Sequence, residues 1–223
     1  MIGIIKNSLP GGPQMTPFEA LRATTELGLR GTLFNSLRDI SPGLDSGEMQ
    51  EVRDEAARLG LHISANLGFI NPALPSRDPL LFDVGNGDPA RGLAQLVKLA
   101  ADIGIHELLF SIGIIEDRFD TQKGWQTQRE AVVDVVRACA PVLRERQSRL
   151  ALRTHEEITT DEILGIIEAV GPDVIGVAYD PVNLFCRLED PVVAADRVAP
   201  HTMQVHVDDA VVRYQDGGIR RFL

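Results

Sequence analysis

The chain has 223 residues, 44% of them hydrophobic, and a formal net charge of −10 at pH 7. This length fits one large domain or two small ones, and the apolar fraction is enough for a sizeable core. The negative charge argues against a nucleic-acid partner, because phosphate binding needs an excess of lysine and arginine. It leaves room for a small anionic substrate held by a few local cations.

The two cysteines, Cys139 and Cys186, lie far apart and lack the spacing of a metal site. We therefore expect a reduced, cytoplasmic protein. The N-terminal segment MIGIIKNSLPGG has too short an apolar run for a signal peptide. No stretch reaches the roughly 18 apolar residues of a membrane span, so no membrane partner is expected.

A helix-like segment, a glycine and a short apolar run recur four times along the chain, at 26–34, 58–65, 102–110 and 169–180. Each glycine is placed to end a helix in the left-handed conformation, and each apolar run suits a strand buried on both faces of a parallel sheet. Capping signals mark the helix starts. They are Thr16 with Glu19, Asp45 with Glu48, Asp88-Pro89, Thr127 with Glu130, Thr159 with Glu162, and Asp190-Pro191.

In chain order, these signals predict seven strands with helices between them. The strands fall near 2–8, 31–36, 62–67, 107–112, 150–155, 175–180 and 203–208. The helices fall near 17–28, 46–59, 88–103, 127–147, 160–170 and 191–199. Strict alternation implies a parallel sheet with right-handed crossovers, and the even spacing favours a single (β/α) barrel domain of the TIM type over residues 1–223.

A doubly wound open sheet is the alternative fold, but the first turn, NSLPGGPQM, lacks its G-x-G-x-x-G fingerprint. A full barrel has eight units and about 250 residues. This chain shows seven and stops at Leu223, in the expected loop after the seventh strand. We expect a barrel that is incomplete at its C-terminal side. Unpaired edges on its first and seventh strands would invite pairing into a homo-oligomer.

The functional side chains of such barrels lie at the C-terminal ends of the strands. Two asparagines stand there on the first and third strands, Asn7 and Asn66, although either could simply satisfy backbone groups. The fifth to seventh strands carry a denser set. It comprises Arg153, His155, Glu156, Asp180, Asn183, His206 and Asp208.

Alternation along a strand places Arg153 and His155 on the same side of the fifth strand. It places His206 and Asp208 on the same side of the seventh strand. Charged groups on a buried strand seldom stand without a partner or a metal. Two arrangements are open. One is a nest of oxygen and imidazole ligands for a divalent metal. The other is a salt bridge from Arg153 that fills the barrel mouth.

At these residues the chain resembles the xylose isomerase-like barrel family of sugar phosphate isomerases and epimerases. The segments that carry the resemblance are LALRTHEEITTDEIL, GVAYDPVNLFCRLEDP and RVAPHTMQVHVDD. The resemblance implies a divalent metal (Mn, Mg, Co or Zn) bound by acids on strands five, six and eight and a histidine on strand seven. Asp180 and His206 match two of these ligands, and Asn183 and His155 match substrate-contact or supporting positions.

The chain departs from the family pattern at four places, of which the first is the absence of the strand-two acid from GTLFNSL. Arg153 stands where the strand-five glutamate is expected, and a guanidinium can neither ligate a metal nor act as a base. Asp208 replaces the strand-seven lysine, and the strand-eight glutamate would lie beyond Leu223. Glu156 or His155 could compensate for the missing ligand, and Arg153 could bind an anionic substrate group.

The first hypothesis is a sugar isomerase or epimerase that abstracts a proton next to a carbonyl with the help of a metal. Its catalytic candidates are His155, Asp208 and Glu156. Its substrate contacts are Arg153, Asn183, Asn66 and Asn7. A dehydratase or lyase would use the same carbanion chemistry. The rival hypothesis is a non-catalytic barrel that binds a sugar-like ligand, and a salt bridge between Arg153 and Asp180 would favour it.

Overall fold

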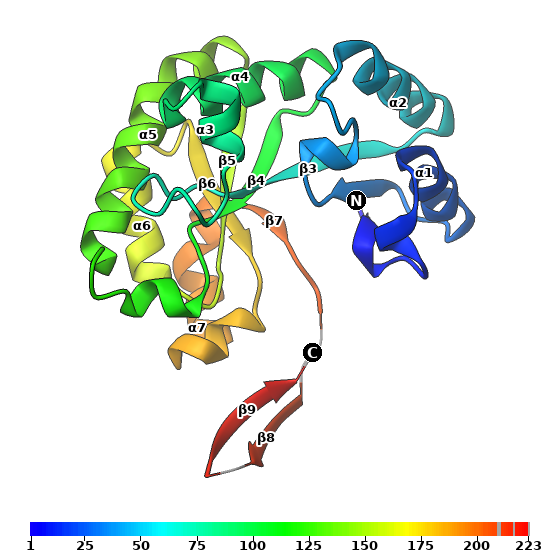
Figure 1. The fold of residues 1–223 in the computed structure, drawn as a ribbon. Coiled ribbons are helices and arrows are strands. Elements are labelled where there is room, and N and C mark those ends of the chain that lie inside the picture. Colours follow the sequence, from blue (N-terminus) through cyan, green and yellow to red (C-terminus); the bar gives the residue numbers. More distant parts are fainter. Residues whose placement is uncertain (209–210, 216, 223) are drawn as a thin grey trace.

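The computed structural model describes residues 1–208, 211–215 and 217–222. Seven parallel strands form one sheet in which each strand pairs with the next one along the chain. That sequential order belongs to a curling barrel and excludes a doubly wound sheet, whose order reverses. Figure 1 shows the sheet curled with helices around its outside. The strands are β1 (Ile4–Ile5), β2 (Gly31–Phe34), β3 (His62–Phe69), β4 (Glu107–Ser111), β5 (Arg149–Arg153), β6 (Ile175–Tyr179) and β7 (Thr202–Val205).

Seven helices connect the strands, and their starts largely follow the predicted capping signals. Thr16 and Thr159 each form a complete capping box with the glutamate three residues later. The box predicted at Thr127 and Glu130 is wrong, because the helix already begins at Trp125. The helices are α1 (Pro17–Glu26), α2 (Ser46–Leu59), α3 (Leu80–Gly85), α4 (Pro89–Asp102), α5 (Trp125–Glu145), α6 (Thr160–Val170) and α7 (Pro191–Val198).

A short helix and a pair of strands were not predicted. Helix α3 has only six residues, too few for helical periodicity to stand out, and Asn86 ends it in the left-handed conformation. The segment after the seventh strand was predicted as a loop. It instead holds β8 (Val211–Gln215) and β9 (Gly218–Phe222), which pair in an antiparallel hairpin.

The sheet has a core on each face, as expected for strands buried on both sides. The larger core lies between the sheet and the helices. The smaller one lies inside the curl, where Leu33, Leu109, Ala151 and Ala178 pack together with Ile5 at its margin. The two alanines leave the inner face shallow at β5 and β6. The polar residues that follow them, Arg153 and Asp180, continue the same inner face by the two-residue alternation of a strand.

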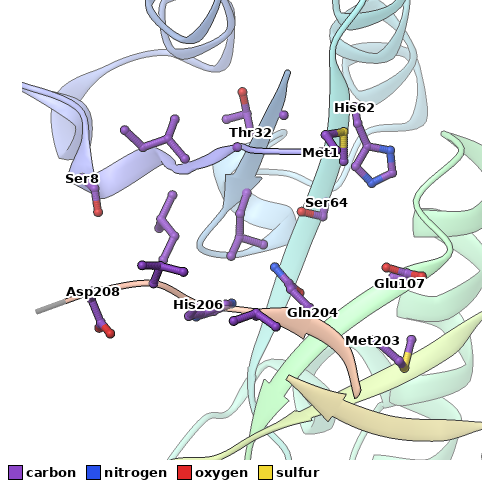
Figure 2. Close-up of a pocket in the computed structure, with 17 residues that line it drawn as sticks. Met1, Ser8, Thr32, His62, Ser64, Glu107, Met203, Gln204, His206 and Asp208 are labelled. Carbon is purple, nitrogen blue, oxygen red and sulfur yellow. The ribbon is translucent and has the colours of Figure 1, made fainter. Parts of the chain in front are cut away.

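The seven strands curl into an open half-barrel, so the predicted incomplete barrel is confirmed. A cavity of about 790 Å³ follows the open side, between the N-terminal strands and β7. Figure 2 shows the side chains along it. They include Ser8, Leu33, Ser64, Gln204, His206 and Asp208.

Within the described residues, no helix has both the length and the apolar character that crossing a membrane requires.

Candidate functional site

An ion pair joins the ends of β5 and β6. Arg153 is the last residue of β5, and its Nε donates to Oδ2 of Asp180 at 2.9 Å, while its Nη2 donates to the same oxygen. Thr154 locks the two strand ends together, since its hydroxyl donates to the Asp180 carbonyl and accepts from the Asp180 amide. The salt bridge considered as an alternative at the barrel mouth is therefore present.

The two oxygens of the Asp180 carboxylate have different surroundings. Oδ2 also accepts a hydrogen bond from Nδ2 of Asn183 at 2.8 Å, so three donors converge on it. Oδ1 is buried, and no partner for it exists within the described part of the chain. Buried polar atoms in proteins are normally hydrogen-bonded, so Oδ1 is an atom that a ligand could satisfy.

His206 follows β7 and extends the inner face next to Asp180. Its backbone amide donates to the Tyr179 carbonyl at 2.8 Å, and its side chain is 7% exposed. Both ring nitrogens are buried without a partner among the described residues. Burial, which is the larger cause, and the Arg153 charge together lower the pKa of His206 to about 4, against an opposing effect of Asp180. The imidazole is therefore neutral at pH 7.

These four residues, Arg153, Asp180, Asn183 and His206, are called the Arg153 cluster below. The divalent metal predicted from the sequence does not fit their donors. The Arg153 guanidinium is hydrogen-bonded to one oxygen of Asp180. Its positive charge would repel a metal cation bound to the same carboxylate. Among the described residues, no group of three histidine, cysteine, aspartate or glutamate side chains could hold a metal ion.

A second buried cluster lies on the loops after β4 and β5. Glu157 is fully buried, and its Oε1 accepts from the amides of Ile112 and Gly113, both at 3.1 Å. Its Oε2 lies 2.6 Å from Nδ1 of His155, which is also 3.0 Å from the Gly113 carbonyl. Glu157, His155 and these two backbone segments form the Glu157 cluster. No contact joins His155 to Arg153 among those that the structure shows.

The other predicted site residues are spread over the same end of the sheet. Asp208 lines the open cavity together with His206. Glu156 accepts from the amide of Ile115 at 3.2 Å. Asn66 accepts from the amide of Gly68 at 2.8 Å, which is the backbone role considered for it. Asn7 is exposed.

Sequence reasoning did not single out Glu157 or Thr154. Glu157 was named only as part of the polar run RTHEE, and no role was assigned to Thr154. The one available signal was the placement of Glu157 two residues after a histidine. It could not reveal that the carboxylate turns inward to bind the β4 loop.

Residues 21–222 match the model of the xylose isomerase-like TIM barrel family. The 3-oxo-isoapionate decarboxylase of Pectobacterium atrosepticum is 25% identical over 146 residues, which are 57% of this chain and 53% of that protein. The chain thus spans about half the length of this curated relative.

The solved structures that share the fold include two sugar epimerases. A D-psicose 3-epimerase of Clostridium cellulolyticum H10, solved with D-tagatose, aligns with a TM-score of 0.70 and 16% identity, over 85% of this chain and 66% of that one. The 3-keto-D-glucoside 4-epimerase YcjR of E. coli aligns with a TM-score of 0.67 and 15% identity, over 87% of this chain and 74% of that one. At these identities the likeness concerns the fold.

Proposed function

Because the chain belongs to the xylose isomerase-like TIM barrel family, we propose that it acts on a small sugar derivative at the Arg153 cluster. The observation that carries the proposal is a set of buried polar atoms at the C-terminal ends of adjacent strands, which have no partner among the described residues. They are Oδ1 of Asp180 and both ring nitrogens of His206. This is the end of a parallel barrel where substrates bind.

The proposed reaction passes through an enolate. The named relatives include sugar epimerases and a decarboxylase of a 3-oxo acid. Epimerisation next to a ketone removes a proton and returns it on the other face. Decarboxylation of a 3-oxo acid breaks the bond to the carboxylate, releases CO₂ and adds a proton to the carbon. In both reactions an electron pair moves onto the carbonyl oxygen, so one scaffold can serve either.

Each member of the Arg153 cluster has a role in this proposal. Neutral His206 donates a hydrogen bond to the carbonyl oxygen and holds it as negative charge develops. The Arg153 guanidinium stabilises the same developing charge. Asp180 and Asn183 fix the direction of Arg153. Asp208 transfers the proton, because it lines the cavity that His206 also lines.

Two other versions of the function remain alternatives. The metal-assisted isomerase predicted from the sequence would need ligands beyond Asp180 and His206. The non-catalytic sugar-binding barrel is favoured by one observation, the ion pair between Arg153 and Asp180, which occupies an acid that would otherwise face the substrate.

Proton exchange with solvent tests the proposal without knowledge of the natural substrate. The chain is incubated in D₂O with D-psicose, D-tagatose and a panel of 3-oxo aldonates, and ¹H NMR follows deuterium entry next to the carbonyl. We expect exchange with at least one probe, a loss of at least 100-fold in Asp208→Asn, and no effect of EDTA. Loss of exchange with EDTA would support the metal-assisted version. Binding of probes without any exchange would support the non-catalytic barrel and refute ours.

A further inference from the structure

We infer that Arg153 supplies the positive charge of this site in place of a divalent metal, and that the site therefore selects ligands that carry an oxyanion beside hydroxyl groups. The inference rests on the proposed function in taking the Arg153 cluster as the place where the substrate binds. It goes further in naming the chemical class of that substrate as a polyhydroxy carboxylate.

The first support is the unused part of the guanidinium. A guanidinium has five N–H donors in a planar fork, and two of its nitrogens, Nε and Nη2, are engaged by Asp180. Within the described residues, Nη1 has no hydrogen-bond partner among the contacts that the structure shows. The side chain is 23% exposed, so a ligand can reach it. Guanidinium groups bind carboxylates and phosphates through this kind of edge.

The second support is the charge of the neighbouring groups. Asp180 shares its engaged oxygen between Arg153 and Asn183, so its negative charge is already balanced by the ion pair. His206 is buried and its ring nitrogens have no partner among the described residues, so its imidazole offers an anion one hydrogen-bond donor. Because the pair is net neutral, a divalent cation gains no net attraction from Asp180, whereas an oxyanion can still accept hydrogen bonds from the unengaged edge of the guanidinium.

The third support is the combination of donors and acceptors on the three strand ends. Nη1 of Arg153 offers a donor to an oxyanion. Oδ1 of Asp180 can only accept, so it requires a donor such as a hydroxyl. His206 offers one donor and one acceptor, which again suits a hydroxyl. The cavity of about 790 Å³ along the open side of the half-barrel reaches this set of groups at His206.

A pair of ligands that differ at one carbon tests the selectivity. D-Gluconate and D-sorbitol share six carbons and five hydroxyl groups, but the first ends in a carboxylate and the second in a hydroxymethyl group. By calorimetry, we expect gluconate to bind at least tenfold more tightly than sorbitol. Arg153→Gln should reduce that ratio to within twofold. Equal binding of the two ligands, or no binding of gluconate at 50 mM, would overturn the inference.

A control variant separates the site from the general charge of the barrel. Arg149 stands at the other end of the same strand, where its side chain donates to the Pro172 carbonyl. Arg149→Gln removes the same charge from β5 and should leave the gluconate-to-sorbitol ratio unchanged. If it lowers the ratio as much as Arg153→Gln does, the preference comes from the overall field, and the inference fails.

Manganese binding tests the other half of the inference. Arg153→Glu places a third acidic or imidazole ligand beside Asp180 and His206. By electron paramagnetic resonance, we expect the wild-type chain and Arg149→Glu to leave Mn²⁺ free at 100 μM. Arg153→Glu should bind one equivalent, at least tenfold more tightly than Arg149→Glu. Stoichiometric Mn²⁺ binding by the wild type would refute the inference, whether or not the variant folds.

These measurements can refute the inference without refuting the proposed function, and the reverse also holds. The gluconate preference and the absence of Mn²⁺ binding are equilibrium properties that need no turnover. If they hold and no probe exchanges deuterium, the anion site stands and the enzymatic proposal falls. If exchange is seen with neutral ketoses while gluconate and sorbitol bind equally, the enzyme stands and the substrate class is wrong.

Discussion

In the Glu157 cluster both carboxylate oxygens accept hydrogen bonds, from two backbone amides and from His155. In the Arg153 cluster, Oδ2 of Asp180 accepts from three donors. Oδ1 of Asp180 and both ring nitrogens of His206 have no partner within the described chain. The two clusters lie at the same end of the sheet and contain similar residues. A buried network in which every polar atom is hydrogen-bonded stabilises the fold. A network with unpartnered polar atoms is suited to binding a ligand.

The largest expected effect comes from the satisfied cluster. Glu157→Ala removes a fully buried carboxylate, leaves two backbone amides without acceptors and takes from Nδ1 of His155 the nearer of its two acceptors. We expect the free energy of unfolding to fall by about 4 kcal/mol, as for other broken buried networks. Urea denaturation measures it. Glu156→Ala, on the neighbouring residue, should cost less than about 1 kcal/mol. Equal losses would show that the Glu157 cluster is no more structural than its surroundings.

The ion pair of the Arg153 cluster should rank second. Arg153→Met strips a buried carboxylate of its cation, and we expect a loss of about 3 kcal/mol in unfolding free energy. Adding Asp180→Asn removes the unpaired charge and should restore at least half of that loss. A double-mutant cycle in urea gives the coupling energy between the two side chains. A coupling below about 0.5 kcal/mol would mean that the pair contributes little to the fold.

The pH dependence of stability tests the environment of His206. Its pKa is lowered from 6.5 to about 4 in the folded chain, so the unfolded chain binds the proton more readily between these values. Stability should therefore decrease as pH falls through this window and level off below it. By linkage, His206 accounts for roughly 2 kcal/mol between pH 8 and pH 5. His206→Gln should remove that share, and identical pH profiles for the two proteins would contradict the assignment.

The comparison of the two clusters also shows what sequence can predict. The alternation of capped helices, glycines and apolar runs predicted the existence of all seven strands of the sheet, because each signal acts within a few residues. The bounds of the first were wrong, since the strand covers only Ile4–Ile5 and a 3-10 helix follows at Lys6–Ser8. Gly28, Gly60 and Gly104 adopt the positive φ expected for residues that end helices. The same prediction is wrong for Gly171, which ends α6 with φ 117° and ψ 132°, outside the left-handed helical region. The hairpin of β8 and β9 was not predicted, because its segment was interpreted as a loop.

The site was predicted in residue identity but not in pairing. The polar run RTHEE placed Arg153, His155, Glu156 and Glu157 at one strand end, yet they separate into two clusters and a loop contact. That separation depends on backbone direction after β5 ends, where alternation no longer applies. The choice of the engaged oxygen of Asp180 depends on three-dimensional packing, which no sequence spacing encodes. The same holds for the lack of a partner at the His206 ring nitrogens within the described residues.

The smallest expected effects concern the two asparagines at strand ends, and they extend the comparison to single hydrogen bonds. Asn66 accepts from the amide of Gly68, whose φ of 77° marks a tight turn. Asn66→Ala should cost about 1 kcal/mol in unfolding free energy and leave gluconate binding unchanged. Asn7 is exposed, and Asn7→Ala should change stability by less than about 0.5 kcal/mol. If Asn66→Ala weakened gluconate binding tenfold with no loss of stability, a side chain that already has a hydrogen-bond partner would be part of the binding site. The presence or absence of hydrogen-bond partners could then not separate structural from functional residues.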